Sequence, residues 1–190
     1  VGGKYASNFE KILVSPFGIR EEIIGMIKNE IKNAKEGKNG KIIMKMNSLV
    51  DKEMIENLIE ASKSGVEIDL IVRGICQLKP GIENLTHNIR IRSIVGRFLE
   101  HSRIYYFNNG GEEKIYLASA DLMPRNLDTR VEVMFPIEDI SGKEKVIKAL
   151  EMFLKDNIKA REMKNDGKYY KAEYSEVEII SQNEFFTECI

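Results

Sequence analysis

The sequence predicts an α/β fold in which helices flank a mixed, largely covered β-sheet, followed by a C-terminal helical extension. Short apolar runs alternate with helical hydrophobic spacing over residues 11–72, a pattern typical of parallel strands joined by crossover helices. Asn109-Gly110-Gly111 then separates two strand-like runs, which indicates an antiparallel hairpin. A further helical pattern over residues 141–163 indicates a long helix.

The first half of the chain contains two expected helices between three expected strands. Helical spacing of apolar residues begins at about Ile19 and ends before Gly37, a plausible C-terminal stop. Asp51 is expected to cap the second helix, which ends near Gly65. The expected strands are residues 11–14, 41–46 and 66–72.

The second half is richer in turn residues and is expected to be antiparallel. Ser141 and Glu144 have the spacing of a capping box at the start of the long helix. The tail beyond Asn165 is polar with a few aromatic residues, and we expect one strand and a short helix there. The expected strands of this half are residues 88–95, 104–108, 114–118 and 130–135.

Composition limits the class of protein. The chain has 190 residues, of which 43% are hydrophobic, so residues 11–190 can bury the core of a single domain. Residues 1–10 resemble a linker or the boundary of an expressed fragment. The 29 Lys and Arg residues balance the 30 Asp and Glu residues, giving a net charge of −1. A globally basic nucleic-acid binder is therefore not expected, and an anion site must come from local clustering.

The cysteines and the hydropathy indicate a cytoplasmic protein. Cys76 and Cys189 are far apart and lack metal-ligand spacing, which is typical of reduced thiols. No apolar run approaches the ~20 residues that a membrane-spanning helix needs. We therefore expect a cytoplasmic location, with membrane association left open for a longer protein that contains this chain.

Polar residues recur where the expected strands end. Lys45 and Asn47 follow the second strand, Arg73 the third and Asp121 the second hairpin arm, while His101 precedes the first arm. Ligands of open α/β sheets bind at the carboxyl ends of strands, so these residues should converge. A neutral imidazole can exchange a proton or a phosphoryl group, and guanidinium groups match phosphate oxygens. The surrounding arginines are Arg97, Arg103, Arg125 and Arg130.

Each of these residues also has a purely structural interpretation. His101 follows Phe98-Leu99 and could close a helix, and Arg73 could be a solvated loop arginine. Asp121 could cap the turn that follows it. The other arginines could form surface ion pairs, Arg97 with Glu100, Arg125 with Asp128 and Arg130 with Glu132. Their shared position at strand ends favours a phosphate or nucleotide site.

One short pattern points to a known chemistry. Phospholipase D-type phosphodiesterases use His-x-Lys-x4-Asp, in which the histidine is the nucleophile. Here His101-Ser-Arg103 has arginine for the lysine, and Asn108 stands where the aspartate would fall. The pattern indicates a diverged relative with a phospholipase D-like sandwich fold.

Four longer segments resemble the last domain of the bacterial polyphosphate kinase family, in the order of that family and at similar spacing. The resemblance is strong over about residues 11–137 and weaker through the C-terminal helix. The segments are KMNSLVD (45–51), LIVRGIC (70–76), SIVGRFLEH (93–101) and ASADLMPRN (118–126), followed by RVE (130–132).

The resemblance implies reversible transfer of the terminal phosphate of ATP to polyphosphate, with Mg²⁺ and a phosphohistidine intermediate. The phosphorylated histidine and the metal-site arginines belong to the preceding domain of the family, so no metal ligand is expected here. The resemblance places the nucleotide-contacting arginine at Arg73 and the second active-site histidine at His101. Lys45, Asn47, Arg97, Arg125 and Asp121 are weaker candidates for lining the polyanion path, on charge and position alone.

The implied partners are ATP or ADP, polyphosphate and the remaining domains of the same polypeptide, with no nucleic acid. The fragment alone is expected to be inactive, and a homo-oligomer of the full-length enzyme is left open. Two alternatives come from other classes: a stand-alone dimeric phospholipase D-like phosphodiesterase that pairs two copies of His101, and a non-catalytic polyanion-binding module.

Overall fold

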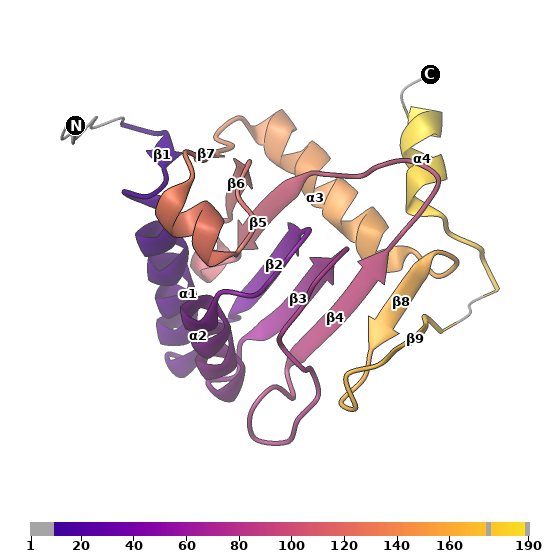
Figure 1. The fold of residues 1–190 in the computed structure, drawn as a ribbon, viewed down its shortest axis with the longest axis horizontal. Coiled ribbons are helices and arrows are strands. Elements are labelled where there is room, and N and C mark those ends of the chain that lie inside the picture. Colours follow the sequence, from indigo (N-terminus) through magenta and orange to yellow (C-terminus); the bar gives the residue numbers. More distant parts are fainter. Residues whose placement is uncertain (1–9, 174–175, 189–190) are drawn as a thin grey trace.

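The structure is a computed structural model that describes residues 10–173 and 176–188 (Figure 1). The helices are α1 (Ile19–Lys35), α2 (Lys52–Lys63), α3 (Ile140–Lys155) and α4 (Ser181–Glu188), with short helical turns η1 (Asn109–Gly111) and η2 (Arg125–Thr129). The strands are β1 (Leu13–Val14), β2 (Lys41–Met46), β3 (Glu67–Val72), β4 (Ile89–Ile94), β5 (Arg103–Phe107), β6 (Lys114–Ala118), β7 (Val133–Pro136), β8 (Ala160–Met163) and β9 (Tyr169–Lys171).

The strands of the described chain form one mixed sheet in the order β1-β7-β6-β5-β2-β3-β4-β8-β9. Only the neighbours β2, β3 and β4 are parallel, and the other pairings are antiparallel. The mixed sheet flanked by helices agrees with the predicted fold class. The expectation that β1 joins the parallel set is wrong, because β1 pairs antiparallel with β7 at the edge, where Leu13 opposes Met134.

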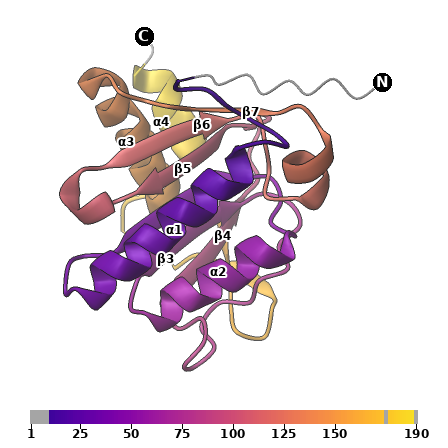
Figure 2. The same ribbon diagram turned by 90° about the vertical axis from the view of Figure 1, so that its left-hand side faces the viewer.

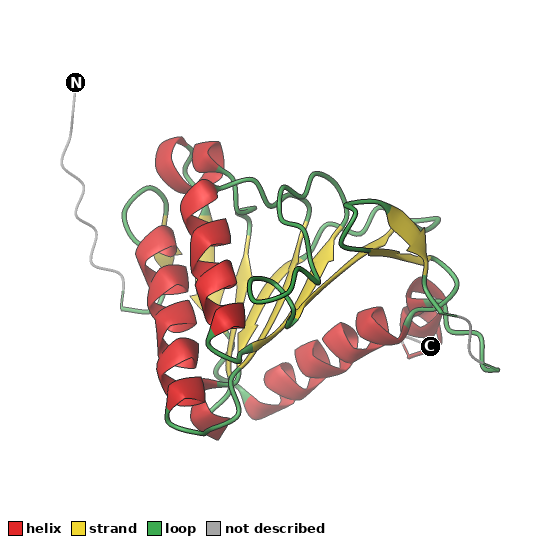
Figure 3. Cartoon of the chain, turned by 90° about the horizontal axis from the view of Figure 1, so that it is seen from below, coloured by secondary structure: helices red, strands yellow, loops and turns green. Residues whose placement is uncertain are grey.

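Helices cover both faces of the sheet. α1 and α2 lie on one face, and α3 and α4 lie on the other (Figures 2 and 3). Alternation along β2 divides the core, since Ile42 and Met44 pack with the α1 and α2 side chains and Ile43 packs with those of α3. By the same alternation, Lys45 points to the α3 face. The buried strands therefore bring a lysine to the end of β2 beneath α3.

The first two helices begin and end much as the sequence predicts. α1 carries Glu21 and Glu22 in its first turn and lysines in its last, which complements the helix dipole. Gly37 follows α1 with a φ of +77°, a conformation that favours glycine at a helix end. The Asp51 side chain accepts a hydrogen bond from Met54 N at 3.0 Å, so the expected N-cap of α2 is confirmed.

The predicted N-cap and the predicted end of the long helix are wrong, although the helix begins at Ile140, one residue from the predicted start. Asp139, rather than Ser141, is the N-cap of α3, and its carboxylate accepts a hydrogen bond from Gly142 N at 2.7 Å. The helix ends at Lys155 rather than near residue 163. Asp156 turns the chain because its buried carboxylate accepts hydrogen bonds from Lys159 N and Ala160 N, and the segment that follows pairs with β4 as β8.

The tail forms the expected strand, β9, and the expected short helix, α4. Cys76 is a half-buried free thiol, and burial raises its pKa, whereas Cys189 lies outside the described residues. His87 is exposed in the loop before β4. In the part of the chain that the structure describes, no helix is both long and apolar enough to cross a membrane.

Candidate functional site

One edge of the sheet collects the predicted site residues. β2, β3, β4 and β6 end at this edge, and β5 begins there, because β5 runs antiparallel to both of its neighbours. The register places Lys45 opposite Ile104 and Arg103 opposite Ala118. The side chains that follow or precede these strands are therefore brought within reach of one another.

His101 is linked to a buried carboxylate through Arg103. Arg103 Nη1 lies 2.8 Å from His101 Nδ1 and also donates to the His101 carbonyl oxygen at 2.9 Å. The other side of the guanidinium binds Asp121 in a bidentate manner, with Nε to Oδ1 at 3.2 Å and Nη2 to Oδ2 at 3.0 Å. Such paired bonds fix the plane of the guanidinium and thereby its direction toward the imidazole.

Asp121 is itself held by the backbone at the end of β2. Its Oδ1 accepts hydrogen bonds from Asn47 N at 2.7 Å and, more weakly, from Ser48 N at 3.4 Å. Asp121 is buried, and its side chain caps this neighbouring turn instead of the turn that follows it. Asn47 thus takes part through its main chain. The structure joins three separate segments through one carboxylate.

The hydrogen bond from Arg103 determines the tautomer of His101. A guanidinium can only donate, so Nδ1 must accept, and the neutral ring carries its proton on Nε2. Desolvation lowers the pKa of His101, and the positive charges of Arg103 and Arg73 lower it further, while Asp121 opposes the shift. His101 is exposed, so its Nε2–H is accessible as a hydrogen-bond donor.

Lys45 is a buried cation beneath this edge. Its Nζ forms an ion pair with Glu100, donates to the Ser102 carbonyl oxygen at 3.2 Å and lies 4.8 Å from the centroid of the Phe153 ring. Desolvation, followed by the charges of Arg73 and Arg103, lowers the pKa of Lys45 to about 7. The negative charge of Asp121 opposes this shift.

Arg73 follows β3 at the same edge and is half-buried. Its carbonyl oxygen accepts a hydrogen bond from Ser93 Oγ at 3.1 Å, and its amide donates to Met46 O at 3.2 Å. Within residues 10–173 and 176–188, no carboxylate forms an ion pair with the Arg73 guanidinium, although its charge acts on both Lys45 and His101. A positioned, uncompensated guanidinium is a suitable ligand for phosphate.

Three predicted arginines remain outside this cluster. Arg97, Arg125 and Arg130 are exposed, and none of them bonds to His101 or Asp121 in the described part of the chain. The surface ion pairs suggested for them are wrong, because the carboxylates have other partners. Glu100 binds Lys45, Asp128 binds Arg20 at 2.8 Å, and Glu132 accepts from Asn126 Nδ2 at 2.5 Å.

Sequence reasoning missed Glu100, Phe153 and Gln182, which line a small cavity together with Lys45 and Arg73. A buried lysine at the end of an apolar strand needs a carboxylate partner, and this requirement could have identified Glu100, which is next to His101 in the sequence. No local pattern distinguishes Gln182 in the polar tail. Asn108, at the aspartate position of the phospholipase D pattern, donates to Asn39 O at 2.7 Å at the far end of β5.

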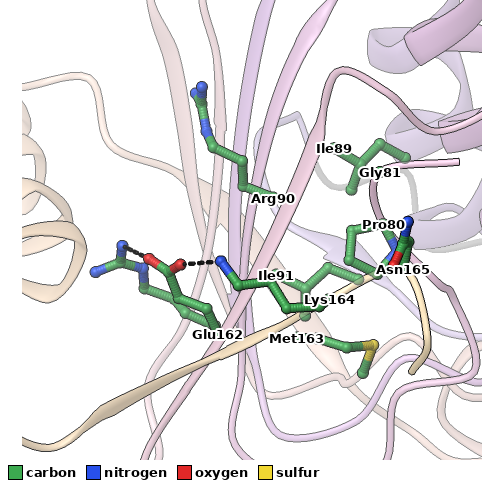
Figure 4. A pocket seen from close by; sticks show the side chains of 10 residues that line it. Pro80, Gly81, Ile89, Arg90, Ile91, Glu162, Met163, Lys164 and Asn165 are labelled. Atoms are coloured by element: carbon green, nitrogen blue, oxygen red, sulfur yellow. Dashed lines mark hydrogen bonds and ion pairs between the residues drawn. The ribbon is translucent and has the colours of Figure 1, made fainter. Parts of the chain in front are cut away.

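A larger pocket of about 350 Å³ lies at the opposite edge of the sheet, between β4 and β8 (Figure 4). Its charged side chains pair with each other: Glu162 binds Arg92 at 3.2 Å and Lys164 at 3.0 Å. Arg90, also at this pocket, pairs with Asp69. The pocket is separate from the His101 cluster.

The described residues do not fit a metal ion. They contain no group of three or more His, Cys, Asp or Glu side chains arranged to hold one. Asp121, the carboxylate nearest His101, is already engaged by Arg103 and the Asn47 amide.

Fold and site together define the class: a phospholipase D-like α/β domain with a histidine and arginines at the carboxyl edge of its sheet. A solved phospholipase D family member, Nuc from Salmonella typhimurium, matches 85% of this chain and 97% of its own with a TM-score of 0.55 and 14% identity, which supports the fold alone. Polyphosphate kinase from Porphyromonas gingivalis matches far more closely, with a TM-score of 0.91 and 42% identity over 95% of this chain and 28% of its own.

The family follows from the sequence comparisons. The family model described as polyphosphate kinase C-terminal domain 2 matches residues 12–182, and the chain belongs to this family. A polyphosphate kinase of Bacillus cereus is 54% identical over 163 residues, which are 86% of this chain and 23% of that protein. A polyphosphate kinase of Prosthecochloris aestuarii is 52% identical over 177 residues, which are 93% of this chain and 25% of that protein. The chain thus spans about a quarter of the length of these relatives.

Proposed function

We propose that this chain forms one wall of the active site of a longer ATP:polyphosphate phosphotransferase and is inactive without the other domains. The proposal rests on family membership and on one observation: the imidazole of His101 is oriented by Arg103 and Asp121 near Arg73, whose guanidinium has no carboxylate partner among the described residues. Phosphoryl transfer requires positioning and positive charge around the phosphoryl oxygens, which these residues can provide.

The tautomer of His101 suggests its role. With Nδ1 occupied by Arg103, the accessible Nε2 carries a proton and cannot attack phosphorus. His101 therefore acts as a donor, to an oxygen of the transferred phosphoryl group or to the leaving oxygen. The nucleophile that carries the phosphoryl group is, in this proposal, a histidine of the preceding domain.

Arg73 is proposed to bind a phosphate oxygen of ATP or ADP. Its position directly after β3 places it on a rigid strand, and the Ser93 hydroxyl fixes its backbone. Lys45 lies too deep for direct contact with substrate and is proposed to hold the His101 loop through Glu100. The Mg²⁺ that the family resemblance implies has no proposed ligand in this chain.

Substitution of His101 in the full-length protein tests the proposal. His101→Ala removes the donor and should lower kcat for ATP-dependent polyphosphate synthesis by about a hundredfold or more. His101→Gln offers an amide N–H in a similar place and should retain more activity than His101→Ala. Wild-type kinetics for His101→Ala, or polyphosphate synthesis by the 190-residue chain alone, would refute the proposed function.

A further inference from the structure

The loop that carries His101 is bound by the C-terminal helix. Gln182, in the first turn of α4, forms two hydrogen bonds with the backbone of Phe98: its Oε1 accepts from Phe98 N at 3.1 Å, and its Nε2 donates to Phe98 O at 2.8 Å. Both functional ends of one amide are thus satisfied by one residue, three positions before His101. Gln182 is buried, with 7% of its surface exposed.

Gly96 leaves the space that this contact needs. A Cβ atom at residue 96 would lie 2.2 Å from Gln182 Oε1 and 2.5 Å from its Cδ. Gly96 does not have the positive φ that by itself favours glycine, so its lack of a side chain matters here for space rather than for backbone conformation. The loop and α4 are therefore fitted to each other at this contact.

The helix that presents Gln182 is anchored to the body of the domain. The carboxylate of Asp156, at the end of α3, accepts hydrogen bonds from Ser181 N at 2.8 Å and Ser181 Oγ at 2.7 Å. Asp156 and Ser181 are 1% and 0% exposed. Phe185 of α4 packs edge-on against Phe153 of α3, with ring centroids 5.0 Å apart. Gln182 therefore projects from a fixed base.

The loop itself contributes little apolar burial. Val95, Phe98 and Leu99 are 67%, 46% and 75% exposed. Polar contacts therefore help to hold the loop in position, and Gln182 supplies the two hydrogen bonds at Phe98. Between Phe98 and His101, Glu100 binds Lys45 and accepts from Ser102 Oγ at 2.7 Å. Loss of the Gln182 side chain would remove both hydrogen bonds between α4 and the Phe98 backbone.

We infer that Gln182 is a positioning residue for His101, through which α4 holds the 95–102 loop in the geometry needed for phosphoryl transfer. The inference rests on the proposed function of His101 and extends it to the C-terminal helix. It assigns a catalytic consequence to a residue that touches neither substrate nor the reacting atoms. Small displacements of an oriented donor lower the rate strongly, since catalysis depends on geometry.

Gln182→Ala in the full-length protein tests this inference. Its kcat for ATP-dependent polyphosphate synthesis should fall by about tenfold to a hundredfold. The KM for ATP should stay within about twofold, because Arg73 is not held by this contact. Asn165→Ala is the control: it removes an exposed amide in the turn between β8 and β9, at the opposite edge of the sheet, and should keep wild-type kcat. Thermal unfolding of each variant identifies any loss caused by global unfolding.

Gly96→Ala tests the same contact from the loop without altering α4. Its methyl group should displace the Gln182 amide and lower kcat as Gln182→Ala does. In the Gln182→Ala background the clash is absent, so Gly96→Ala should add no further loss. Multiplicative losses in this double variant would contradict the proposed contact.

Combination with His101→Ala separates this inference from the proposed function. If Gln182 acts through His101, Gln182→Ala should have no further effect on kcat in the His101→Ala protein. A normal kcat for Gln182→Ala beside an impaired His101→Ala would overturn the inference and leave the proposed function intact. If the losses of kcat caused by Gln182→Ala and His101→Ala multiply in the double variant, that result would also overturn the inference. Normal kinetics for His101→Ala would refute the proposed function itself.

Discussion

Arg103 Nη1 lies 2.8 Å from His101 Nδ1, while the same guanidinium is held by both oxygens of Asp121. The direct contact between these two residues is therefore oriented by a carboxylate that lies 18 residues from Arg103 along the chain. The contact makes Nδ1 an acceptor and leaves Nε2–H exposed.

The tautomer can be observed directly in the 190-residue chain. Nitrogen chemical shifts should show an unprotonated Nδ1 and a protonated Nε2 for neutral His101. Because desolvation and then the Arg103 charge lower the pKa of His101, the ring should titrate below the ordinary histidine value, and Arg103→Met should move its titration midpoint upward. The chain has only two histidines, so His87→Gln assigns the resonances. A protonated Nδ1 in the neutral ring would contradict the assignment.

Asp121→Asn should destabilise the fold and weaken the His101 site together. The amide keeps the shape of the carboxylate but leaves the Arg103 charge without its partner, at a cost of about 3 kcal/mol in the free energy of unfolding. Urea unfolding measures this value. Glu138→Gln is the control, since the exposed pair of Glu138 with Lys11 should be worth less than about 1 kcal/mol. Equal losses for the two variants would contradict the buried role of Asp121.

Lys45 should make folding stability depend on pH. Its pKa is about 7 in the folded chain against an ordinary value of 10.5, so between these values unfolding takes up a proton and stability rises with pH. Below about pH 7 the lysine is charged in both states, and the full cost of its burial is present. Lys45→Met removes this dependence.

The free energy of unfolding of Lys45→Met minus that of the wild type should therefore decrease from about pH 7 toward pH 10.5. Lys45→Arg is the control for charge, because a guanidinium does not lose its proton in this range. The free energy of unfolding of Lys45→Arg minus that of the wild type should decrease with pH at the same slope as for Lys45→Met, whatever its absolute value. A difference that is constant over this range would rule out the lowered pKa.

Arg73→Ala in the full-length protein should mainly weaken the use of ATP. Loss of a charged hydrogen bond to phosphate, worth about 1.5–3 kcal/mol, should raise the KM for ATP by roughly tenfold to a hundredfold, with a smaller effect on kcat. Lys168→Ala, an exposed lysine in the turn between β8 and β9, should leave the KM unchanged. An unaltered KM for Arg73→Ala would refute its role as a nucleotide ligand.

Local patterns predicted most of the fold. The predicted bounds of β2 are confirmed residue for residue, because KIIMKM is a short, largely apolar run between polar turns, and α2 begins directly after its N-cap Asp51. The errors lie where tertiary contacts override local preference. The helical pattern continues past Lys155, but Asp156 gains four hydrogen bonds by turning the chain, and β4 offers an edge with which β8 can pair.

The candidate site was predictable in its location but not in its connections. Strand ends identified Lys45, Arg73, His101 and Asp121, because the polarity of parallel strands places their ends at one edge. Which of them touch depends on side-chain reach across strands. The bond between Arg103 and Asp121 therefore could not be read from spacing, nor could the exposed positions of Arg97 and Arg125.

The sequence by itself determined the class of fold, the family and the edge of the sheet where the charged residues gather, since these depend on periodicity, turn chemistry and segments of contiguous residues. Only the tertiary structure decided that Asp121 orients Arg103 toward His101, that Lys45 is buried against Glu100, and that Gln182 binds the His101 loop. The last contact spans 84 residues of sequence. Such contacts are fixed by packing of the whole domain, because no local pattern encodes which distant backbone group a buried amide will meet.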